Sequence, residues 1–172
     1  MNELAAITLA AGKSKRMKSD TIKVLHKICG KYVLEYVTDL VESLDIKKHV
    51  IVVGHQKERV KETFADKNLF YAEQNEQKGT GHAVMMAEEY FQNAKGDVLI
   101  LCGDVPLLKK ETLENLYKIH KKNNAAASVL TAHFENPFNH GRIIKDEKGN
   151  IQKIVEEKDA SMEEKKVQEI NS

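Results

Sequence analysis

The sequence predicts an α/β fold: a Rossmann-like, mostly parallel sheet with helices on both of its faces. Apolar runs typical of buried strands alternate with segments of helical periodicity between residues 4 and 132. Glycine or polar residues follow several of these runs directly, as they do where ligands bind at the carboxyl edge of a parallel sheet. With 172 residues, of which 41% are hydrophobic, the chain is long enough to bury a core.

The elements follow from periodicity and length. The first strand is the apolar run 4–9, and the first clear helix has apolar residues at helical spacing between Val33 and Leu44. The other elements expected up to residue 132 are a strand at 49–53, a helix at 56–64, a strand at 69–72, a helix opened by Gly79, a strand at 98–101, a helix at 111–121 and a strand at 125–132.

After Phe134 the pattern changes. Two short apolar runs, 142–145 and 151–155, flank a polar turn that contains a glycine, and they predict a β-hairpin. Ser161 and Glu164 have the spacing of an N-cap and an acid at N3, so a short helix is expected there. The prediction is therefore a single domain over residues 1–172, in which a β-hairpin excursion follows the parallel sheet.

Composition excludes several classes of protein. The formal net charge of +1 argues against nucleic acid or a membrane surface as the main partner. No apolar run approaches the roughly 20 residues that span a bilayer, and the N-terminal run lacks a signal-peptide pattern. Cys29 and Cys102 are too few for a disulfide framework or a zinc site. These features predict a cytoplasmic protein.

The loop after the first strand is the most informative segment. Small residues and Gly12 end that strand, so backbone N–H groups can approach an anion closely. Seven basic residues lie between positions 13 and 31, against one acid, Asp20. A local positive cluster in a balanced chain indicates a polyphosphate ligand.

Two common phosphate loops do not fit this segment. A P-loop needs a glycine where the chain has Ile7, and the dinucleotide fingerprint needs glycines where it has Ser14 and Met17. The pattern small-small-Gly-x-x-x-Arg-Met followed by a lysine is instead typical of nucleotidyltransferases. There Arg16 and Lys23 would neutralise the phosphates of a nucleoside triphosphate; a solvated basic loop is the alternative.

Further motifs identify a family. In order they are Lys23-Val24-Leu25-His26, Ala72-Glu73-Gln74, Gly79-Thr80-Gly81-His82-Ala83, Gly103-Asp104-Val105-Pro106-Leu107, Gly141-Arg142-Ile143, Ile154-Val155-Glu156-Glu157-Lys158-Asp159-Ala160 and Glu169-Ile170-Asn171. With the opening loop they closely resemble the N-terminal uridylyltransferase domain of bacterial bifunctional UDP-N-acetylglucosamine pyrophosphorylase/glucosamine-1-phosphate N-acetyltransferase, over essentially the whole chain.

The resemblance implies a fold of the nucleotide-diphospho-sugar transferase type and a reaction. UTP and N-acetylglucosamine 1-phosphate would give UDP-N-acetylglucosamine, a precursor of peptidoglycan and lipopolysaccharide, and pyrophosphate, with Mg²⁺ as cofactor. Residue by residue, it implies catalytic roles for Arg16 and Lys23, nucleotide binding by Leu9, Ala10, Ala11, Gly12, Lys23, Gln74, Gly79 and Thr80, and sugar-phosphate binding by Gly103, Gly141, Glu156 and Asn171.

Three residues of the motifs, Gln74, Glu156 and Asp104, also have a chemical reason for their expected roles. The carboxamide of Gln74 can donate and accept, which matches the imide edge of uracil. The carboxylate of Glu156 can accept from sugar hydroxyls, and strand alternation is expected to turn the adjacent Glu157 away. Asp104, at the end of a strand that Pro106 terminates, can hold Mg²⁺ against triphosphate oxygens. The histidines, His82 among them, show no metal spacing and are interpreted as ordinary polar or packing residues.

The sequence ends at Ser172, where the family continues with more of the same domain and a left-handed β-helix with acetyltransferase activity. We therefore expect an incomplete nucleotidyltransferase domain with weak or no turnover. It would lack a second metal ligand, an asparagine in the family, and the domain through which full-length relatives oligomerise.

Two alternatives stay open: a nucleotide-binding remnant without turnover, and a related nucleotidyltransferase with another base or sugar. The chain also has Ile22 and Tyr32 where the family usually has proline, which predicts altered loop stiffness.

Overall fold

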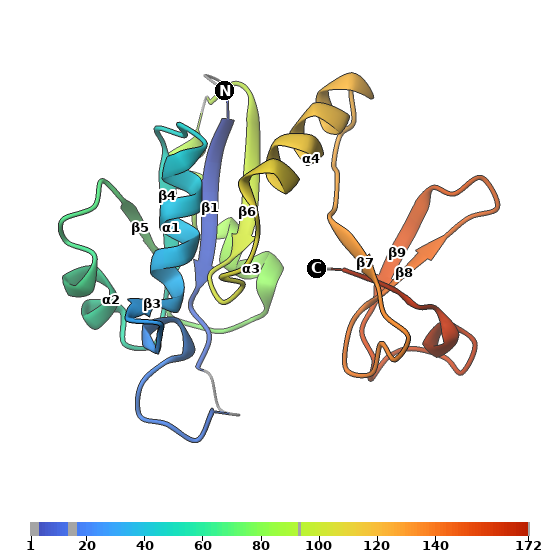
Figure 1. The fold of residues 1–172 in the computed structure, drawn as a ribbon, viewed down its shortest axis with the longest axis horizontal. Coiled ribbons are helices and arrows are strands. Elements are labelled where there is room, and N and C mark those ends of the chain that lie inside the picture. Colours follow the sequence, from blue (N-terminus) through green and yellow to red (C-terminus); the bar gives the residue numbers. More distant parts are fainter. Residues whose placement is uncertain (1–3, 14–16, 93, 172) are drawn as a thin grey trace. The chain divides into compact units, whose positions relative to one another are not determined.

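The computed structural model describes residues 4–13, 17–92 and 94–171 (Figure 1). The chain divides into two compact units, residues 1–113 and residues 114–172.

The first unit is built on a parallel sheet. Its strands are β1 (Leu4–Ala10), β4 (His49–Val53), β5 (Phe70–Glu73) and β6 (Asp97–Cys102), in the order β5-β4-β1-β6. Every neighbouring pair in this sheet is parallel. All five residues of β4 are buried, as expected for an inner strand that is covered on both faces. The predicted parallel sheet is confirmed.

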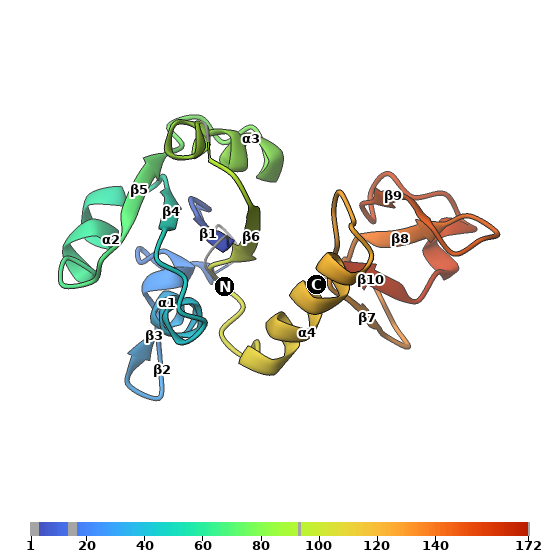
Figure 2. The same ribbon diagram turned by 90° about the horizontal axis from the view of Figure 1, so that it is seen from above.

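Helices cover both faces of this sheet. One face packs against α1 (Val33–Ser43) and α2 (Lys57–Thr63), and the other against α3 (Thr80–Met85) and the 3-10 helix η3 (Glu88–Phe91). Within β4, Ile51 and Val53 belong to the first of these two cores, whereas Val50 and Val52 belong to the second. Figure 2 shows α1 and α3 on opposite sides of the strands. The helix expected after Gly79 is thus present in two pieces.

A small ribbon between β1 and α1 was not predicted from the sequence. After the 3-10 helix η2 (Lys23–Leu25), β2 (Lys27–Ile28) pairs with β3 (Lys31–Tyr32) in an antiparallel hairpin. The two turn residues, Cys29 and Gly30, have φ angles of +48° and +86°. Positive φ at both central residues is the signature of the tight hairpin turn that matches strand twist.

The second unit is an antiparallel sheet. Helix α4 (Lys110–Lys122) crosses the boundary between the units, and β7 (Thr131–His133), β8 (Arg142–Lys145), β9 (Ile151–Val155) and β10 (Glu169–Asn171) follow. The strand order is β7-β10-β8-β9, so the predicted hairpin is confirmed as β8 and β9. The two hydrogen bonds expected between Ser161 and Glu164 are present, because Ser161 N–H donates to Glu164 Oε2 (2.8 Å) and Glu164 N–H donates to Ser161 Oγ (3.2 Å). The 3-10 helix η4 (Glu164–Lys166) nevertheless begins at Glu164, so Ser161 is not its N-cap.

The strand expected at residues 125–132 is a wrong prediction. Only Thr131–His133 form a strand, and that strand pairs antiparallel with β10 instead of joining the parallel sheet. Residues 125–127 are alanines, which have low strand propensity and bring little apolar surface to bury. None of the described helices is long and apolar enough to cross a membrane.

Candidate functional site

The carboxyl edge of the parallel sheet gathers the residues that were singled out in the first unit. All four strands run in one direction, so their carboxyl ends share one edge. Ala11 and Gly12 follow β1, Gln74 follows β5, and Gly103 and Asp104 follow β6. Segments far apart in the sequence therefore meet where parallel sheets bind ligands.

Glycines allow the loops at this edge to approach closely. A Cβ on Gly54, directly after β4, would lie 2.8 Å from the Ala11 carbonyl oxygen and 3.1 Å from that of Gln74. Gln77 Nε2 donates to the same Ala11 oxygen at 2.8 Å, which ties the loop after β5 to the loop after β1. Gly54 was not among the predicted site residues, although a glycine at the end of a buried strand is a recognisable signal of close approach.

Gly103 packs in the same way on the other side of β1. It is buried, its N–H donates to the Leu9 carbonyl at 2.9 Å, and a Cβ there would lie 2.9 Å from that oxygen. Its amide is thus engaged within the protein, and its contact with a sugar phosphate stays a prediction.

Gln74, the residue expected to bind the base, is buried directly after β5. Gln74 is only 4% exposed, and its backbone N–H donates to the Val53 carbonyl at 2.7 Å. Its side-chain Nε2 lies 3.2 Å from the Gly79 carbonyl oxygen and 2.9 Å from His82 Nδ1. The amide nitrogen therefore has partners within the protein, which differs from the expectation that this carboxamide both donates to and accepts from a base.

Gly79 shapes the turn that opens α3. Its φ of +104° and ψ of 179° lie in a region that is open essentially to glycine alone. This turn places Thr80 at the first position of α3 and brings the Gly79 carbonyl to Gln74.

Glu73 anchors the strand end before Gln74. Lys57 Nζ lies 2.5 Å from Glu73 Oε2, and Lys61 Nζ lies 2.7 Å from Glu73 Oε1, both from α2. These hydrogen bonds, first that from Lys57 and then that from Lys61, lower the pKa of Glu73 to about 2. Glu73 stays ionised at neutral pH and holds the end of β5 to α2.

The charged part of the edge is an ion pair between two predicted site residues. Lys23 Nζ donates to Asp104 Oδ2 at 2.9 Å, and the two side chains are 44% and 41% exposed. Lys23 begins η2, whose next two residues, Val24 and Leu25, are buried in the core together with Ile22. This apolar anchor holds the lysine at the site. Arg16, the other expected catalytic residue, lies outside the described residues.

Asp104 is a suitable ligand for Mg²⁺, but within the described part of the chain it would be a single protein ligand and not part of a cage. Among the described residues there is no group of three or more His, Cys, Asp or Glu side chains that could form a metal cage. A single accessible carboxylate is nevertheless a common donor set for Mg²⁺, which keeps several waters and takes further oxygens from substrate phosphates.

In the second unit, the structure brings two of the three predicted sugar-phosphate residues together. Asn171 N–H donates to the Gly141 carbonyl at 3.3 Å, and a Cβ on Gly141 would lie 2.5 Å from Asn171 Oδ1. Glycine at 141 therefore makes room for the asparagine side chain.

Glu156 and Glu157 differ in their surroundings, but not in the way that strand alternation predicted: Glu157, expected to turn away, is the one that contacts a buried side chain. Glu157 Oε2 lies 2.6 Å from Nη2 of Arg142, whose side chain is 2% exposed, while Glu156 is exposed. Both glutamates follow the end of β9, so strand alternation does not distinguish them. The ion pair of Glu157 with Arg142 does.

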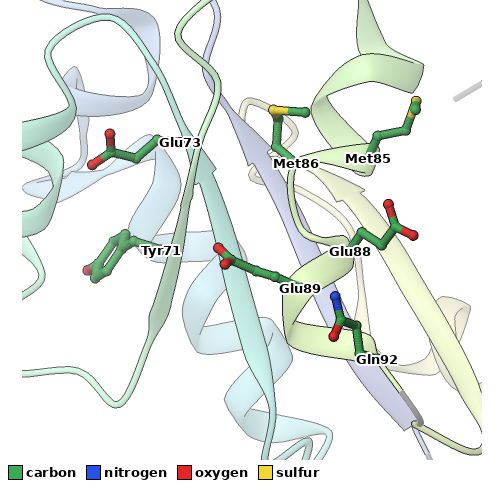
Figure 3. Close-up of a pocket in the computed structure, with 7 residues that line it drawn as sticks. All are labelled: Tyr71, Glu73, Met85, Met86, Glu88, Glu89 and Gln92. Carbon is green, nitrogen blue, oxygen red and sulfur yellow. The ribbon is translucent and has the colours of Figure 1, made fainter.

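A separate hollow lies beside the edge strand β5 (Figure 3). In this view Tyr71 and Glu73 point away from the residues of α3 and η3. Its lining residues are Tyr71, Glu73, Met85, Met86, Glu88, Glu89 and Gln92. Three glutamates line this hollow, so it does not suit a triphosphate.

Comparison with known proteins agrees with this geometry. A family model described as the MobA-like NTP transferase domain matches residues 6–148. The bifunctional protein GlmU of Clostridioides difficile is 49% identical over 167 residues, which are 97% of this chain and 36% of that protein. GlmU of Enterococcus faecalis is 49% identical over 172 residues, 100% of this chain and 37% of that protein. The chain spans a little over a third of the length of these curated relatives.

One solved structure shares the fold. A protein of Bacillus anthracis, assigned as a glucose-1-phosphate thymidylyltransferase, matches with a TM-score of 0.77 and 17% identity, over 98% of this chain and 69% of that chain. At this level of identity the likeness concerns the fold alone.

Proposed function

The chain belongs to the family of MobA-like NTP transferase domains, and we propose that it transfers the uridylyl group of UTP to N-acetylglucosamine 1-phosphate. The observation that carries this proposal is the carboxyl edge of the parallel sheet. There, a buried carboxamide, Gln74, follows β5 and a carboxylate, Asp104, follows β6 of the same sheet, and Lys23 forms an ion pair with Asp104.

In this proposal Gln74 binds the base. Its Nε2 is engaged by Gly79 and His82, so its Oε1 is the atom left to accept a hydrogen bond. Uracil offers a matching N3–H donor. The exposed backbone of Gly79 and Thr80 lies next to this position, and Leu9, Ala10, Ala11 and Gly12 supply the loop for the phosphates.

The Lys23–Asp104 pair is suited to rearrangement when a triphosphate binds. Ion pairs this exposed are worth only about 0.2–1 kcal/mol, so Lys23 can leave Asp104 at little cost. Its ammonium then neutralises phosphate charge, and Arg16 is proposed to act beside it.

The reaction requires positioning and charge neutralisation more than covalent help from the protein. A phosphate oxygen of the sugar phosphate attacks the α-phosphorus of UTP, and the bond from that phosphorus to the β-phosphate oxygen breaks. Pyrophosphate leaves with the charge that Lys23 stabilises. Mg²⁺ held by Asp104 would neutralise phosphate oxygens when bound.

Gly141, Glu156 and Asn171 are proposed to bind the sugar phosphate. The Glu156 carboxylate is exposed and can accept from sugar hydroxyls, and the Asn171 amide can donate and accept. The product would serve cell-wall synthesis, as the motifs of the chain imply.

The test is a pyrophosphate-release assay with Mg²⁺, in which UTP is compared with CTP and ATP, and N-acetylglucosamine 1-phosphate with glucose 1-phosphate. We expect release to require UTP and to be fastest with the N-acetylated sugar. Equal binding of UTP, CTP and ATP in calorimetry would contradict uridylyl transfer. Tight UTP binding without pyrophosphate release would identify a nucleotide-binding protein instead.

A further inference from the structure

The orientation of the Gln74 carboxamide is determined by its two neighbours. Its terminal atoms are one nitrogen with two hydrogens and one oxygen that only accepts. The atom 3.2 Å from the Gly79 carbonyl oxygen must be the nitrogen, because a carbonyl oxygen can only accept. The same nitrogen lies 2.9 Å from His82 Nδ1. Both amide hydrogens therefore have an acceptor within the protein.

This geometry also determines the form of His82. Since Nδ1 faces a donor, Nδ1 is the accepting nitrogen and the ring hydrogen sits on Nε2. The Gly79 carbonyl is held in turn, because it accepts the N–H of Ala83 at 3.1 Å. Gly79 and His82 lie in the first turn of α3, so one short segment presents both acceptors to Gln74.

We propose that His82 is a positioning residue for base selection, which keeps Gln74 Oε1 as the only carboxamide atom available to the base. The proposal rests on the function proposed above and deepens it. Within the described part of the chain, no hydrogen bond reaches Gln74 Oε1. An accepting oxygen at this point favours the N3–H of uracil over the N3 lone pair of cytosine.

The alternative orientation of the carboxamide is unfavourable. A flipped Gln74 could donate to cytosine N3, but its oxygen would then face the Gly79 carbonyl and His82 Nδ1. The hydrogen bonds of Gln74 to Gly79 and His82 would both be lost, and the Gln74 oxygen would face two other acceptors. Water could not replace these bonds easily, because Gln74 is almost fully buried. Selection against cytosine thus depends on His82 although His82 need not touch the nucleotide.

The experiment compares two variants that differ in one acceptor. His82→Ala removes Nδ1, whereas His82→Asn places an amide oxygen near the position of Nδ1. Alanine and asparagine are both compatible with a helix, and His82 is only partly buried. Both variants are therefore expected to fold. Dissociation constants for UTP, CTP and inorganic triphosphate are measured by calorimetry, with thermal unfolding as a check of the fold.

We expect His82→Ala to reduce the preference for UTP over CTP by up to roughly tenfold and His82→Asn to retain it. Binding of inorganic triphosphate should stay unchanged in both. A wild-type preference that persists in His82→Ala, or that disappears equally in His82→Asn, would overturn the proposal.

A second measurement separates this proposal from the proposed function. Long-range ¹H–¹⁵N spectra of the ligand-free protein report which ring nitrogen of His82 carries the hydrogen. We expect Nε2, and a hydrogen on Nδ1 would overturn the positioning role whatever nucleotide binds. Equal wild-type affinity for UTP and CTP, with the hydrogen on Nε2, would instead refute uridine selection, the premise on which the role depends.

Discussion

Single residues at the site combine a structural and a functional task, and Lys23 illustrates this. Its ammonium neutralises Asp104 at 2.9 Å, in a pair exposed enough to be weak. Hydrogen bonds to charged groups contribute about 1.5–3 kcal/mol when partners are well placed. A triphosphate that replaces Asp104 as the partner can therefore gain more than the pair loses.

The first prediction concerns this lysine. Lys23→Ala should weaken binding of UTP and of inorganic triphosphate by about tenfold or more. Lys18→Ala is the matched control, because Lys18 is exposed in the same basic segment. Calorimetry on both variants is the measurement. A loss at Lys18 as large as that at Lys23 would show that diffuse charge, and not a placed ammonium, binds the phosphates.

The two positions where the family resemblance implies proline, 22 and 32, have a backbone that suits proline. Ile22 has φ −64° and ψ 150°, and Tyr32 has φ −64° and ψ 147°. Proline imposes nearly this φ, so both backbone conformations are compatible with proline. Ile22 instead contributes a side chain that is 2% exposed, and the Tyr32 N–H donates to Glu35 Oε2 at 3.1 Å.

The second prediction concerns pH and His49. Burial, with a smaller effect of Lys67, lowers the pKa of His49 from 6.5 to about 4. Its Nε2 lies 2.7 Å from Thr8 Oγ1 inside the sheet. The unfolded chain therefore binds a proton at higher pH than the folded protein does. The stability contributed by neutral His49 is complete above pH 6.5 and is lost as pH falls towards 4.

The free energy of unfolding should fall by about 3 kcal/mol as the pH is lowered from 6.5 to about 4. Urea unfolding at pH 7 and pH 5 is the measurement, and His49→Gln is the control that cannot be protonated in this range. The slope of unfolding free energy against pH should be steeper in the wild type. Parallel slopes in the two proteins would argue that His49 does not titrate between the folded and unfolded states.

At the scale of elements, glycine decides how closely the loops at the carboxyl edge can meet. A Cβ on Gly54 would lie 2.8 Å from the backbone oxygen of Ala11, whereas a Cβ on Gly81, in α3, would meet nothing within 4 Å. Substitution by alanine can therefore be compared at two positions: at Gly54 the new Cβ would clash with backbone, and at Gly81 it would have free space.

The third prediction follows from this contrast. Gly54→Ala should destabilise the protein by about 1–3 kcal/mol, because backbone has to move, and it should weaken UTP binding by displacing the segments at Ala11 and Gln74. Gly81→Ala should be neutral or stabilising by about 0.5–1 kcal/mol, since alanine is the better helix former. Chemical unfolding and nucleotide titration of both variants provide the comparison. Equal effects of the two substitutions would count against close packing at Gly54.

At the scale of the whole molecule, the predicted contacts divide between the two units. The nucleotide-binding residues lie in residues 1–113, together with Gly103, whereas the other three sugar-phosphate residues, Gly141, Glu156 and Asn171, lie in residues 114–172. Ligands protect the segments that they hold against local opening. The division can therefore be followed by hydrogen exchange.

The fourth prediction is a pattern of protection. UTP with Mg²⁺ should slow amide exchange in peptides that contain residues 9–12 and 74–82, and leave peptides of the antiparallel sheet unchanged. Addition of N-acetylglucosamine 1-phosphate should then slow exchange around Gly141 and Asn171. Protection by UTP alone that is confined to the second unit would contradict this assignment of the two substrates.

Much of this architecture was predictable from the sequence, because it depends on local pattern. The buried strands β1 and β4, the amphipathic helix α1 and the hairpin β8–β9 follow from apolar periodicity over a few residues. The positions of Gly12, Gln74 and Asp104 after strands follow from the same pattern, since the carboxyl ends of parallel strands share one edge.

Other features were decided only by tertiary structure, because they depend on pairings between distant segments. β7 forms because β10 offers a partner strand, with Asn171 opposite Thr131, and the alanines before β7 stay outside any sheet. Thr131 Oγ1 also donates to Glu169 Oε1 at 2.8 Å, a contact between residues 38 positions apart. The hydrogen bonds of the Gln74 carboxamide could not be assigned from its chemistry alone, because an amide can present either end. Only the turn at Gly79 and the placement of His82 on α3 orient it, and the specificity proposed for this protein depends on that orientation.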